Sequence, residues 1–162
     1  MDISITTVEK MMALLNQKNA SYDKFPIYRT TFDSVFTTGV ASTIQNFCQI
    51  YFNEAVVEGV RVEVAFALAM LETNWLRFGG DVLPNPYNFA GLGATGNGVH
   101  VNVFKNVMIG IRAQIQHLKC YASTETLNKA LVDQRWSDAL REKATTVEFL
   151  AFQIIRMERD GQ

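Results

Sequence analysis

Apolar side chains recur at helical spacing in the first part of the chain. A Thr-x-x-Glu capping box at residues 6–9 opens a stripe that predicts a short helix to about Asn16, formed by Val8, Met11, Met12 and Leu15. A Ser-x-x-Gln box at residues 42–45 opens a second helical stripe, which is expected to stop at Gly59, a typical residue just past a helix end. Residues 18–41, between them, carry five aromatic side chains without a steady period, and we expect an irregular arm.

The segment from Val60 to Phe78 differs from the others because it has hardly any polar face. A helix that is apolar on all sides lies in the middle of a domain, so this segment is predicted to be the central helix. Gly79 and Gly80 end it, and prolines and glycines exclude a long helix as far as about Phe104.

Residues 79–105 are predicted to form a small Gly-rich loop or β-hairpin lobe beside the central helix. The Gly-Asn-Gly at 96–98 suits a hairpin turn, since Gly and Asn tolerate positive φ. Beyond the lobe, apolar residues predict helices over about 106–122 and 127–139. A Thr-x-x-Glu box at 145–148 predicts a last helix.

The expected fold is mainly α, with one domain over residues 1–162: a helix and arm over 1–41 and a helical core over 42–162. A chain of this length fits one domain, and 48% hydrophobic with 19% charged residues argues against disorder and coiled coil. Fifteen basic and sixteen acidic side chains give a formal charge of −1, so no field attracts nucleic acid or anionic lipid. No stretch approaches the roughly 20 apolar residues that span a bilayer. A monomer that binds a weakly charged partner, such as a glycan, suits this composition.

Two features bear on the compartment. Cys48 and Cys120 fall among apolar neighbours on predicted helices, and we expect buried reduced thiols, with one disulfide as the alternative. Residues 1–9 contain neither the basic nor the apolar region of a signal peptide. We therefore expect an excised domain, or a protein exported or released by another route.

Glu72 is the one ionisable residue between Val64 and Leu76. A carboxylate among apolar neighbours is poorly hydrated, which is expected to raise the pKa of Glu72. Cleavage of a glycosidic bond near neutral pH needs such a protonated carboxyl to donate to the departing sugar oxygen. The alternatives are an ion pair of Glu72 with Arg61 or Arg77, or an exposed side chain.

A second catalytic group is harder to find in the sequence. Asp81 is followed by no acidic residue until Glu125, so Asp81 is the nearest candidate in sequence. The 2-acetamido oxygen of the substrate can instead supply the nucleophile. Tyr87, Asn88 and Tyr121 are then candidates to orient that amide and to stabilise the positive charge.

Aromatic residues gather around the predicted lobe, and sugar rings stack on aromatic faces. The substrate-binding candidates are Trp75, Phe78, Tyr87, Asn88, Phe89, Gly91 and Phe104. For each aromatic residue the alternative is a place in the core. Tyr87 is the best candidate for binding because it lies in a loop, between a proline and an asparagine.

Four runs at natural spacing carry a family resemblance, namely residues 42–51, 59–82, 87–96 and 109–119. The second run contains the Glu72-Thr73 step, and the third is similar to an asparagine–apolar–x–Gly loop. Together they resemble the glucosaminidase domain of bacterial cell-wall hydrolases, glycoside hydrolase family 73 and its relatives. The resemblance covers about residues 41–136 without a gap.

The resemblance implies a lysozyme-like α-helical fold and an endo-β-N-acetylglucosaminidase that cuts peptidoglycan glycan strands outside the cell. It implies that Glu72 is the general acid and that a catalytic tyrosine falls on Tyr121 or Tyr87. Neither a metal nor an organic cofactor is implied.

Residues 132–136 depart from the Asp-Pro-aromatic step of the family, and its Gly-Trp-Ala and Tyr-Gly stretches are absent. Two alternatives therefore stay open: a lytic transglycosylase of the same fold, which releases a 1,6-anhydro sugar, and a non-catalytic glycan-binding or assembly protein. His117 is expected to be a surface residue or a core neighbour rather than a catalytic group.

Overall fold

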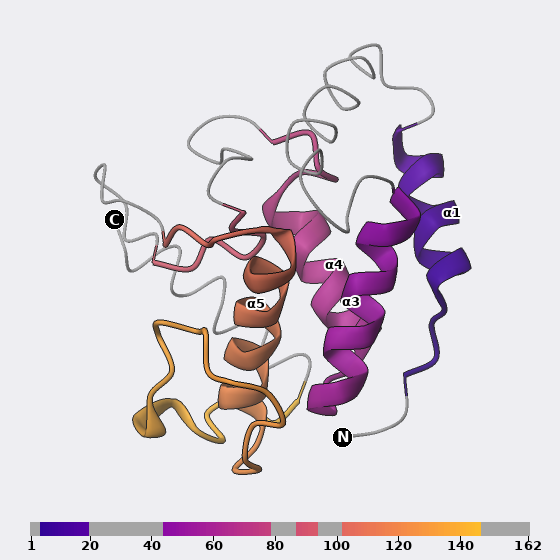
Figure 1. The fold of residues 1–162 in the computed structure, drawn as a ribbon. Helices are drawn as coiled ribbons and strands as arrows, with labels where there is room; N and C mark the ends of the chain where they lie inside the picture. The colour runs from indigo at the N-terminus through magenta and orange to yellow at the C-terminus, as the bar shows by residue number, and fades with distance from the viewer. Residues whose placement is uncertain (1–3, 20–43, 79–86, 94–101, 147–162) are drawn as a thin grey trace.

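The computed structural model describes residues 4–19, 44–78, 87–93 and 102–146. Over these residues the protein is mainly helical and contains no strand (Figure 1). The helices are α1 (Val8–Asn19), α3 (Ile44–Glu58), α4 (Val62–Glu72), α5 (Val107–Ala122) and the short 3-10 helix η1 (Asp138–Leu140). None of the helices in this part of the chain has the length and apolarity that a membrane crossing requires.

α1 begins one residue later than the capping box at residues 6–9 predicts, with Thr7 rather than Thr6 as the capping residue, whereas α3 ends at the predicted glycine. The hydroxyl of Thr7 accepts a hydrogen bond from the backbone N–H of Lys10 at 3.3 Å, in the first turn of α1. At the end of α3, Gly59 adopts a φ of 70°, and the N–H of Val60 bonds to the carbonyl of Ala55 at 2.9 Å. This is a Schellman closure, so the predicted glycine stop is confirmed.

α3 and α5 form the main helix pair and run in the same direction (Figure 1). Midway along the pair, the hydroxyl of Tyr51 donates to Oε1 of Gln114 at 2.6 Å. At the carboxyl ends of the two helices, Glu58 pairs with Lys119 at 3.1 Å. α4 runs in the opposite direction, so it ends near the point where α5 begins, and α1 packs on α3.

The most enclosed helix is α5 rather than α4, so the prediction of the central helix was wrong. Eleven of the sixteen residues of α5 are buried, against five of the eleven in α4. α4 also ends at Glu72, and Leu71 is 68% exposed. The sequence does not indicate how deeply α5 is buried, because this helix buries the polar residues Gln114, Gln116 and Lys119. Hydrogen bonds inside the protein offset the cost of removing their polar groups from water.

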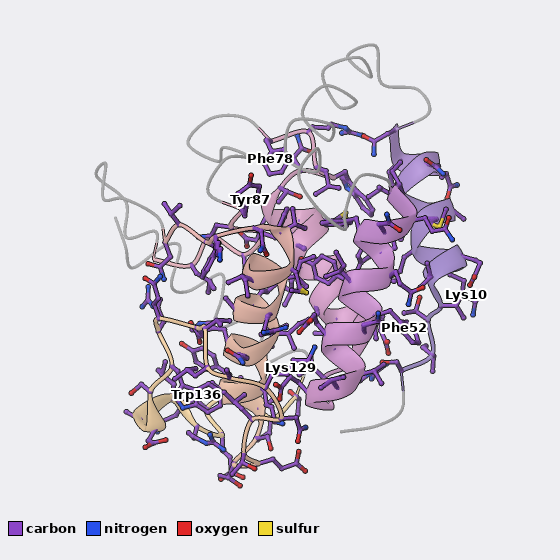
Figure 2. The ribbon with its side chains drawn as sticks, viewed as in Figure 1. Lys10, Phe52, Phe78, Tyr87, Lys129 and Trp136 are labelled. Carbon is purple, nitrogen blue, oxygen red and sulfur yellow. The ribbon has the colours of Figure 1, made fainter. Side chains whose placement is uncertain are left out.

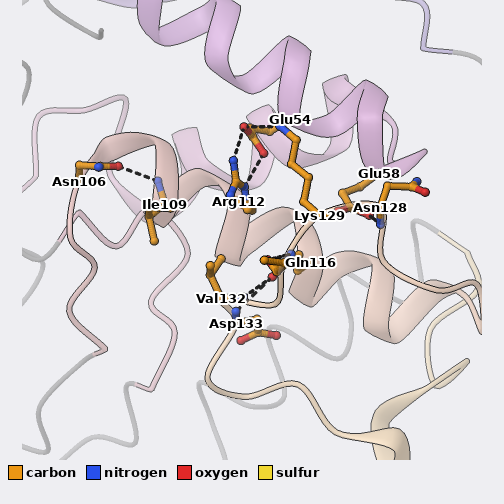
Figure 3. Close-up of polar contacts among 11 residues, drawn as sticks. Glu54, Glu58, Asn106, Ile109, Arg112, Gln116, Asn128, Lys129, Val132 and Asp133 are labelled. Atoms are coloured by element: carbon orange, nitrogen blue, oxygen red, sulfur yellow. Dashed lines mark hydrogen bonds and ion pairs between the residues drawn. The ribbon is translucent and has the colours of Figure 1, made fainter. Parts of the chain in front are cut away.

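The predicted helix over 127–139 is also wrong, since only η1 is helical there. The carboxylate of Glu58 accepts hydrogen bonds from the backbone N–H groups of Asn128 and Lys129, both at 2.9 Å (Figure 3). The same carboxylate pairs with Lys119, and neither side chain of this pair is more than 1% exposed. Bonds to an ionised acceptor are roughly twice as strong as neutral ones, so Glu58 fixes the start of this segment without a helix.

Gln116 of α5 fixes the next part of the segment (Figure 3). Its Oε1 accepts hydrogen bonds from the backbone N–H groups of Val132 and Asp133 at 2.8 and 3.2 Å. Its Nε2 donates to the carbonyl of Ala130 at 3.0 Å. One buried amide thus satisfies backbone groups that a helix would have paired with one another.

Cys48 on α3 and Cys120 on α5 are buried and free, so the prediction of reduced thiols is confirmed. Burial raises the pKa of the Cys48 thiol to about 12 and also raises the pKa of Cys120. A thiolate is the reactive form of cysteine, so both side chains act as small apolar core residues.

Three predicted features lie outside the described residues. They are nearly all of the arm over 18–41, the Gly-Asn-Gly turn at 96–98, and the helix that was expected to follow residues 145–148.

Candidate active site

Glu72 is the last residue of α4, and its side chain is half-buried. The residue before it, Leu71, is largely exposed, whereas the residue after it, Thr73, has no exposed surface. The carboxylate therefore stands where the buried face of α4 meets the protein surface. A group that exchanges protons with a bound substrate needs such a position.

A left-handed turn follows Glu72 directly. The three consecutive residues Asn74, Trp75 and Leu76 have φ values of 49°, 61° and 60°, and Phe78 follows with 55°. Asparagine tolerates this conformation, but for the others it costs about 1–3 kcal/mol each. Strain of this kind persists only where surrounding contacts enforce it, and it collects at functional sites.

Backbone hydrogen bonds close the turn. The N–H of Trp75 bonds to the carbonyl of Met70 at 2.7 Å, and the N–H of Phe78 bonds to the carbonyl of Thr73 at 2.9 Å. These bonds satisfy carbonyl groups that the end of a helix leaves without partners. The backbone after Glu72 is therefore fixed rather than frayed.

α1 holds the outer side of this turn. Asn19, which is completely buried, donates to the carbonyl of Trp75 at 3.5 Å and accepts a hydrogen bond from Nε of Arg77 at 2.9 Å. Arg77 also donates to the carbonyl of Lys18 at 2.6 Å, and the ammonium of Lys18 lies 5.3 Å from the centre of the Trp75 ring. No local pattern indicates these contacts, because 58 residues separate Asn19 from Arg77.

Asn88 shapes the loop 87–93 from inside. Its Nδ2 donates to the carbonyls of Leu92 and Asn102 at 2.8 and 3.0 Å. Its Oδ1 accepts from the N–H groups of Ala90 and Leu92 at 3.3 and 3.0 Å. Only 5% of Asn88 is exposed, so the amide that we expected to orient a substrate is committed to the loop itself.

Gly91 brings this loop against Glu72. Its φ is 60°, and a Cβ atom at this position would lie 3.4 Å from Oε2 of Glu72. Glycine permits the left-handed backbone, which brings the loop to within van der Waals distance of the carboxylate. Two regions that the sequence predicts as parts of one site, the end of α4 and the Gly-rich loop, therefore meet.

The beginning of the loop rests on α5. A Cβ atom on Gly110 would overlap the carbonyl oxygen of Tyr87, so the absence of a side chain lets the loop backbone lie on the helix. Tyr87 itself has a φ of 52°. This contact places the loop at the end of α5 that lies nearest to the end of α4.

The predicted stacking aromatics fall into two groups. Trp75, Phe78 and Tyr87 are half-buried. Figure 2 shows Phe78 and Tyr87 at the end of the molecule where α4 ends and α5 begins. Phe89 and Phe104 are 1% and 5% exposed and belong to the core, where they support the loop from below. The first group keeps surface with which a ligand can make contact.

Of the two other predicted catalytic residues, the structure places only Tyr121, and Tyr121 is not brought to Glu72. Asp81 lies outside the described residues. Tyr121 lies in the last turn of α5, about 16 Å along the helix from Gly110 at the rise of 1.5 Å per residue. It is 7% exposed, and burial raises its pKa. Of the two tyrosines named from the sequence, Tyr87 is the one at the Glu72 end.

His117 packs beside Tyr121, with 5.1 Å between the ring centres. Its Nδ1 lies 2.9 Å from Oδ2 of Asp133, whose side chain is completely buried. This pair ties the segment after α5 to the helix. Among the residues that the structure describes, no group of three or more His, Cys, Asp or Glu side chains is placed to hold a metal ion.

Comparison with known proteins finds a relative whose function is not described. No family model matches the chain, and no solved structure matches it with significance. A protein of Borreliella burgdorferi, described as an uncharacterized protein, is 38% identical to it over 104 residues. The alignment covers 64% of this chain and 51% of the relative, so the chain spans about half the length of that protein.

Proposed function

We propose that the protein is a peptidoglycan hydrolase, an endo-β-N-acetylglucosaminidase similar to glycoside hydrolase family 73. It cuts the β-1,4 bond that follows N-acetylglucosamine in glycan strands, and it acts outside the cell at the wall, as a monomer. The observation that carries this proposal is the approach of Gly91 to the half-buried carboxylate of Glu72. That approach combines a candidate acid and a Gly-rich loop at one end of the helices.

The surroundings of Glu72 support a sugar as the ligand. Trp75, Phe78 and Tyr87 keep exposed surface near the same end of the molecule. Aromatic faces bind the C–H surfaces of sugar rings, and a formal charge of −1 leaves the protein with little preference for a highly charged partner. The lysozyme-like arrangement of the helices, with a hairpin lobe over residues 79–105, is part of this proposal.

In the proposed reaction, Glu72 donates its proton to the glycosidic oxygen as the bond from C1 to that oxygen breaks. The carbonyl oxygen of the substrate's 2-acetamido group attacks C1 and forms a cyclic oxazolinium ion. Water then opens this ring, and the Glu72 carboxylate takes the proton from the water. Asp81 is the alternative second group, with water or the carboxylate itself attacking C1.

Glu72→Gln tests the proposal. The amide keeps the shape of the side chain and removes the proton donor, so turnover of purified peptidoglycan is expected to fall at least about 100-fold. Glu63→Gln is the matched control, because Glu63 lies in the first turn of the same helix and pairs with Arg61. Thermal unfolding of both variants is measured alongside to show that the fold is kept.

Mass spectrometry of the released fragments separates the competing functions. Reducing-end N-acetylglucosamine supports the hydrolase, whereas a 1,6-anhydro muramic end identifies a lytic transglycosylase. If wild-type protein binds the glycan but releases nothing, the protein is a binding or assembly protein. A Glu72→Gln variant as active as Glu63→Gln overturns the assignment of the acid.

A further inference from the structure

The turn that follows Glu72 is held by a hydroxyl group with no access to solvent. Thr73 is 0% exposed. Its Oγ1 donates a hydrogen bond to the carbonyl of Ala69 at 2.7 Å and accepts one from the N–H of Leu76 at 3.1 Å. One oxygen atom thus connects the last turn of α4 to the left-handed turn beyond it.

This connection uses both functions of a hydroxyl group, as a donor and as an acceptor. The carbonyl of Ala69 accepts the backbone N–H of Thr73 at 3.0 Å as well as the hydroxyl, so the hydroxyl adds a second bond there. For the N–H of Leu76, a residue that is 1% exposed, the Thr73 hydroxyl is the acceptor. Serine and threonine supply both from a short side chain, whereas valine, of nearly the same shape, supplies neither. The identity of residue 73 therefore matters to the backbone on each side of it.

A second set of contacts holds the same turn from α1. Arg77 bonds to the side chain of Asn19 and to the carbonyl of Lys18, and Asn19 reaches the carbonyl of Trp75. The turn is therefore fixed from inside by Thr73 and from outside by α1. The side chains that leave this fixed backbone include Glu72 and Trp75.

We propose that Thr73 is a positioning residue for Glu72, acting through its hydroxyl, with Arg77 and Asn19 as the outer support of the same turn. The proposal rests on the proposed function, since it assigns Glu72 the role of the acid. Thr73 has no surface with which to touch a substrate, so its effect passes through the backbone to the Glu72 carboxylate.

The expected effect of removing the hydroxyl is on turnover rather than on binding. A displacement of about 1 Å of a catalytic group lowers the rate about 100-fold while the sugar contacts elsewhere remain. For Thr73→Val we therefore expect kcat on soluble glycan fragments to fall about 10- to 100-fold, with KM changed less than about threefold. Thr73→Ser keeps the hydroxyl and is expected to restore at least about half of the wild-type kcat.

Tyr51→Phe is the matched control. It removes another buried side-chain hydrogen bond, from Tyr51 to Gln114 at 2.6 Å, in the middle of the helix pair. Its loss of stability is expected to be similar, but its kcat is expected to stay near the wild-type value. A fall in kcat for Thr73→Val but not for Tyr51→Phe, with rescue by Thr73→Ser, supports the proposal.

Two results overturn it: a kcat of Thr73→Val equal to that of Tyr51→Phe, or a Thr73→Ser variant as slow as Thr73→Val. If Thr73→Val does not fold, Arg77→Gln decides, because it weakens the outer support at a half-buried position. Its kcat is expected to fall at least about threefold with KM unchanged, and an unchanged kcat rejects the proposal. An active Glu72→Gln variant would instead refute the proposed function, so the two failures are distinct.

Discussion

The carbonyl oxygen of Tyr87 occupies the space in which a Cβ atom of Gly110 would lie. The backbone of Tyr87 therefore packs directly against the first turn of α5. Gly91, four residues further along the loop, lies beside Glu72, since a Cβ atom there would be 3.4 Å from Oε2. Gly110 on α5 thus determines how closely the backbone of the loop approaches α5, and with it the position of Gly91 beside Glu72.

Gly110→Ala is expected to destabilise the protein, although alanine is the better helix former by about 1 kcal/mol. The added methyl group would displace the backbone of Tyr87, and overpacking of this kind costs about 1–3 kcal/mol. We also expect lower turnover, because the displaced loop carries Gly91 away from Glu72. Urea unfolding and peptidoglycan turnover measure the two effects. A more stable variant with full activity would show that the loop does not rest on α5.

Gly91→Ala is expected to lower turnover about tenfold or more, because the methyl group would lie in contact with Oε2 of Glu72, at 3.4 Å, and shield the carboxylate from the substrate. Gly59→Ala is the matched control. Both glycines have positive φ, at 60° and 70°, so both variants lose about 1–2 kcal/mol through the backbone. A Cβ at Gly59, however, meets no atom within 4 Å. Equal activity of the two variants would contradict a role for Gly91 beside the carboxylate.

Part of this arrangement follows from the sequence. The apolar stripes predicted α1 and α3 correctly and Gly59 predicted the end of α3, because these are local signals; the cap of α1 is Thr7 rather than the predicted Thr6. Glu72 and Gly91 were singled out separately, and the structure brings them together. Their relation to substrate stays a prediction.

The remainder depends on contacts between distant residues. The burial of α5 was missed because Gln114 and Lys119 look like surface residues until their partners on α3 and α4 are known. The segment 127–139 has a helical pattern, but Glu58 takes its backbone N–H groups from 70 residues away. Asn19 supports the turn after Glu72, but the residues next to it in sequence do not indicate this role, because its partners Trp75 and Arg77 are far along the chain.

Glu58→Leu is expected to cost about 3–5 kcal/mol of stability, because it leaves the buried ammonium of Lys119 and two backbone amides without their partner. Lys119→Met is expected to cost less, since the carboxylate of Glu58 keeps both amide bonds. Amide hydrogen exchange provides the sharper measurement. The amides of Asn128 and Lys129 are expected to lose protection in Glu58→Leu and to keep it in Lys119→Met. The same exchange rates in both variants would contradict the anchoring role of Glu58.

Stability is expected to fall at alkaline pH. Burial raises the pKa of the Cys48 thiol to about 12, and burial with the nearby Cys48 raises the pKa of Tyr51. The unfolded chain releases these protons at lower pH than the folded protein does. The contribution of Cys48 is therefore complete below pH 9, the ordinary thiol value, and is lost as the pH rises toward 12.

Urea unfolding between neutral and alkaline pH measures this loss, which amounts to at most about 1.4 kcal/mol per pH unit for one group. Cys48→Ala removes one of the titrating groups, so its stability is expected to decline less steeply above pH 9. At neutral pH the thiol is protonated in both the folded and the unfolded chain, so the difference in stability between wild type and Cys48→Ala measured there is the reference for the alkaline range. Parallel curves across the alkaline range would show that the thiol is not protected by burial.

The segment after α5 owes its course to Glu58 and Gln116, which lie on two other helices. It cannot adopt that course before α3 and α5 have met, since neither helix alone offers both sets of acceptors. During synthesis these residues leave the ribosome after both helices, which is the order in which their acceptors are needed. Side-chain substitutions within the segment are then expected to leave its path unchanged, because the acceptors that hold its backbone lie on α3 and α5.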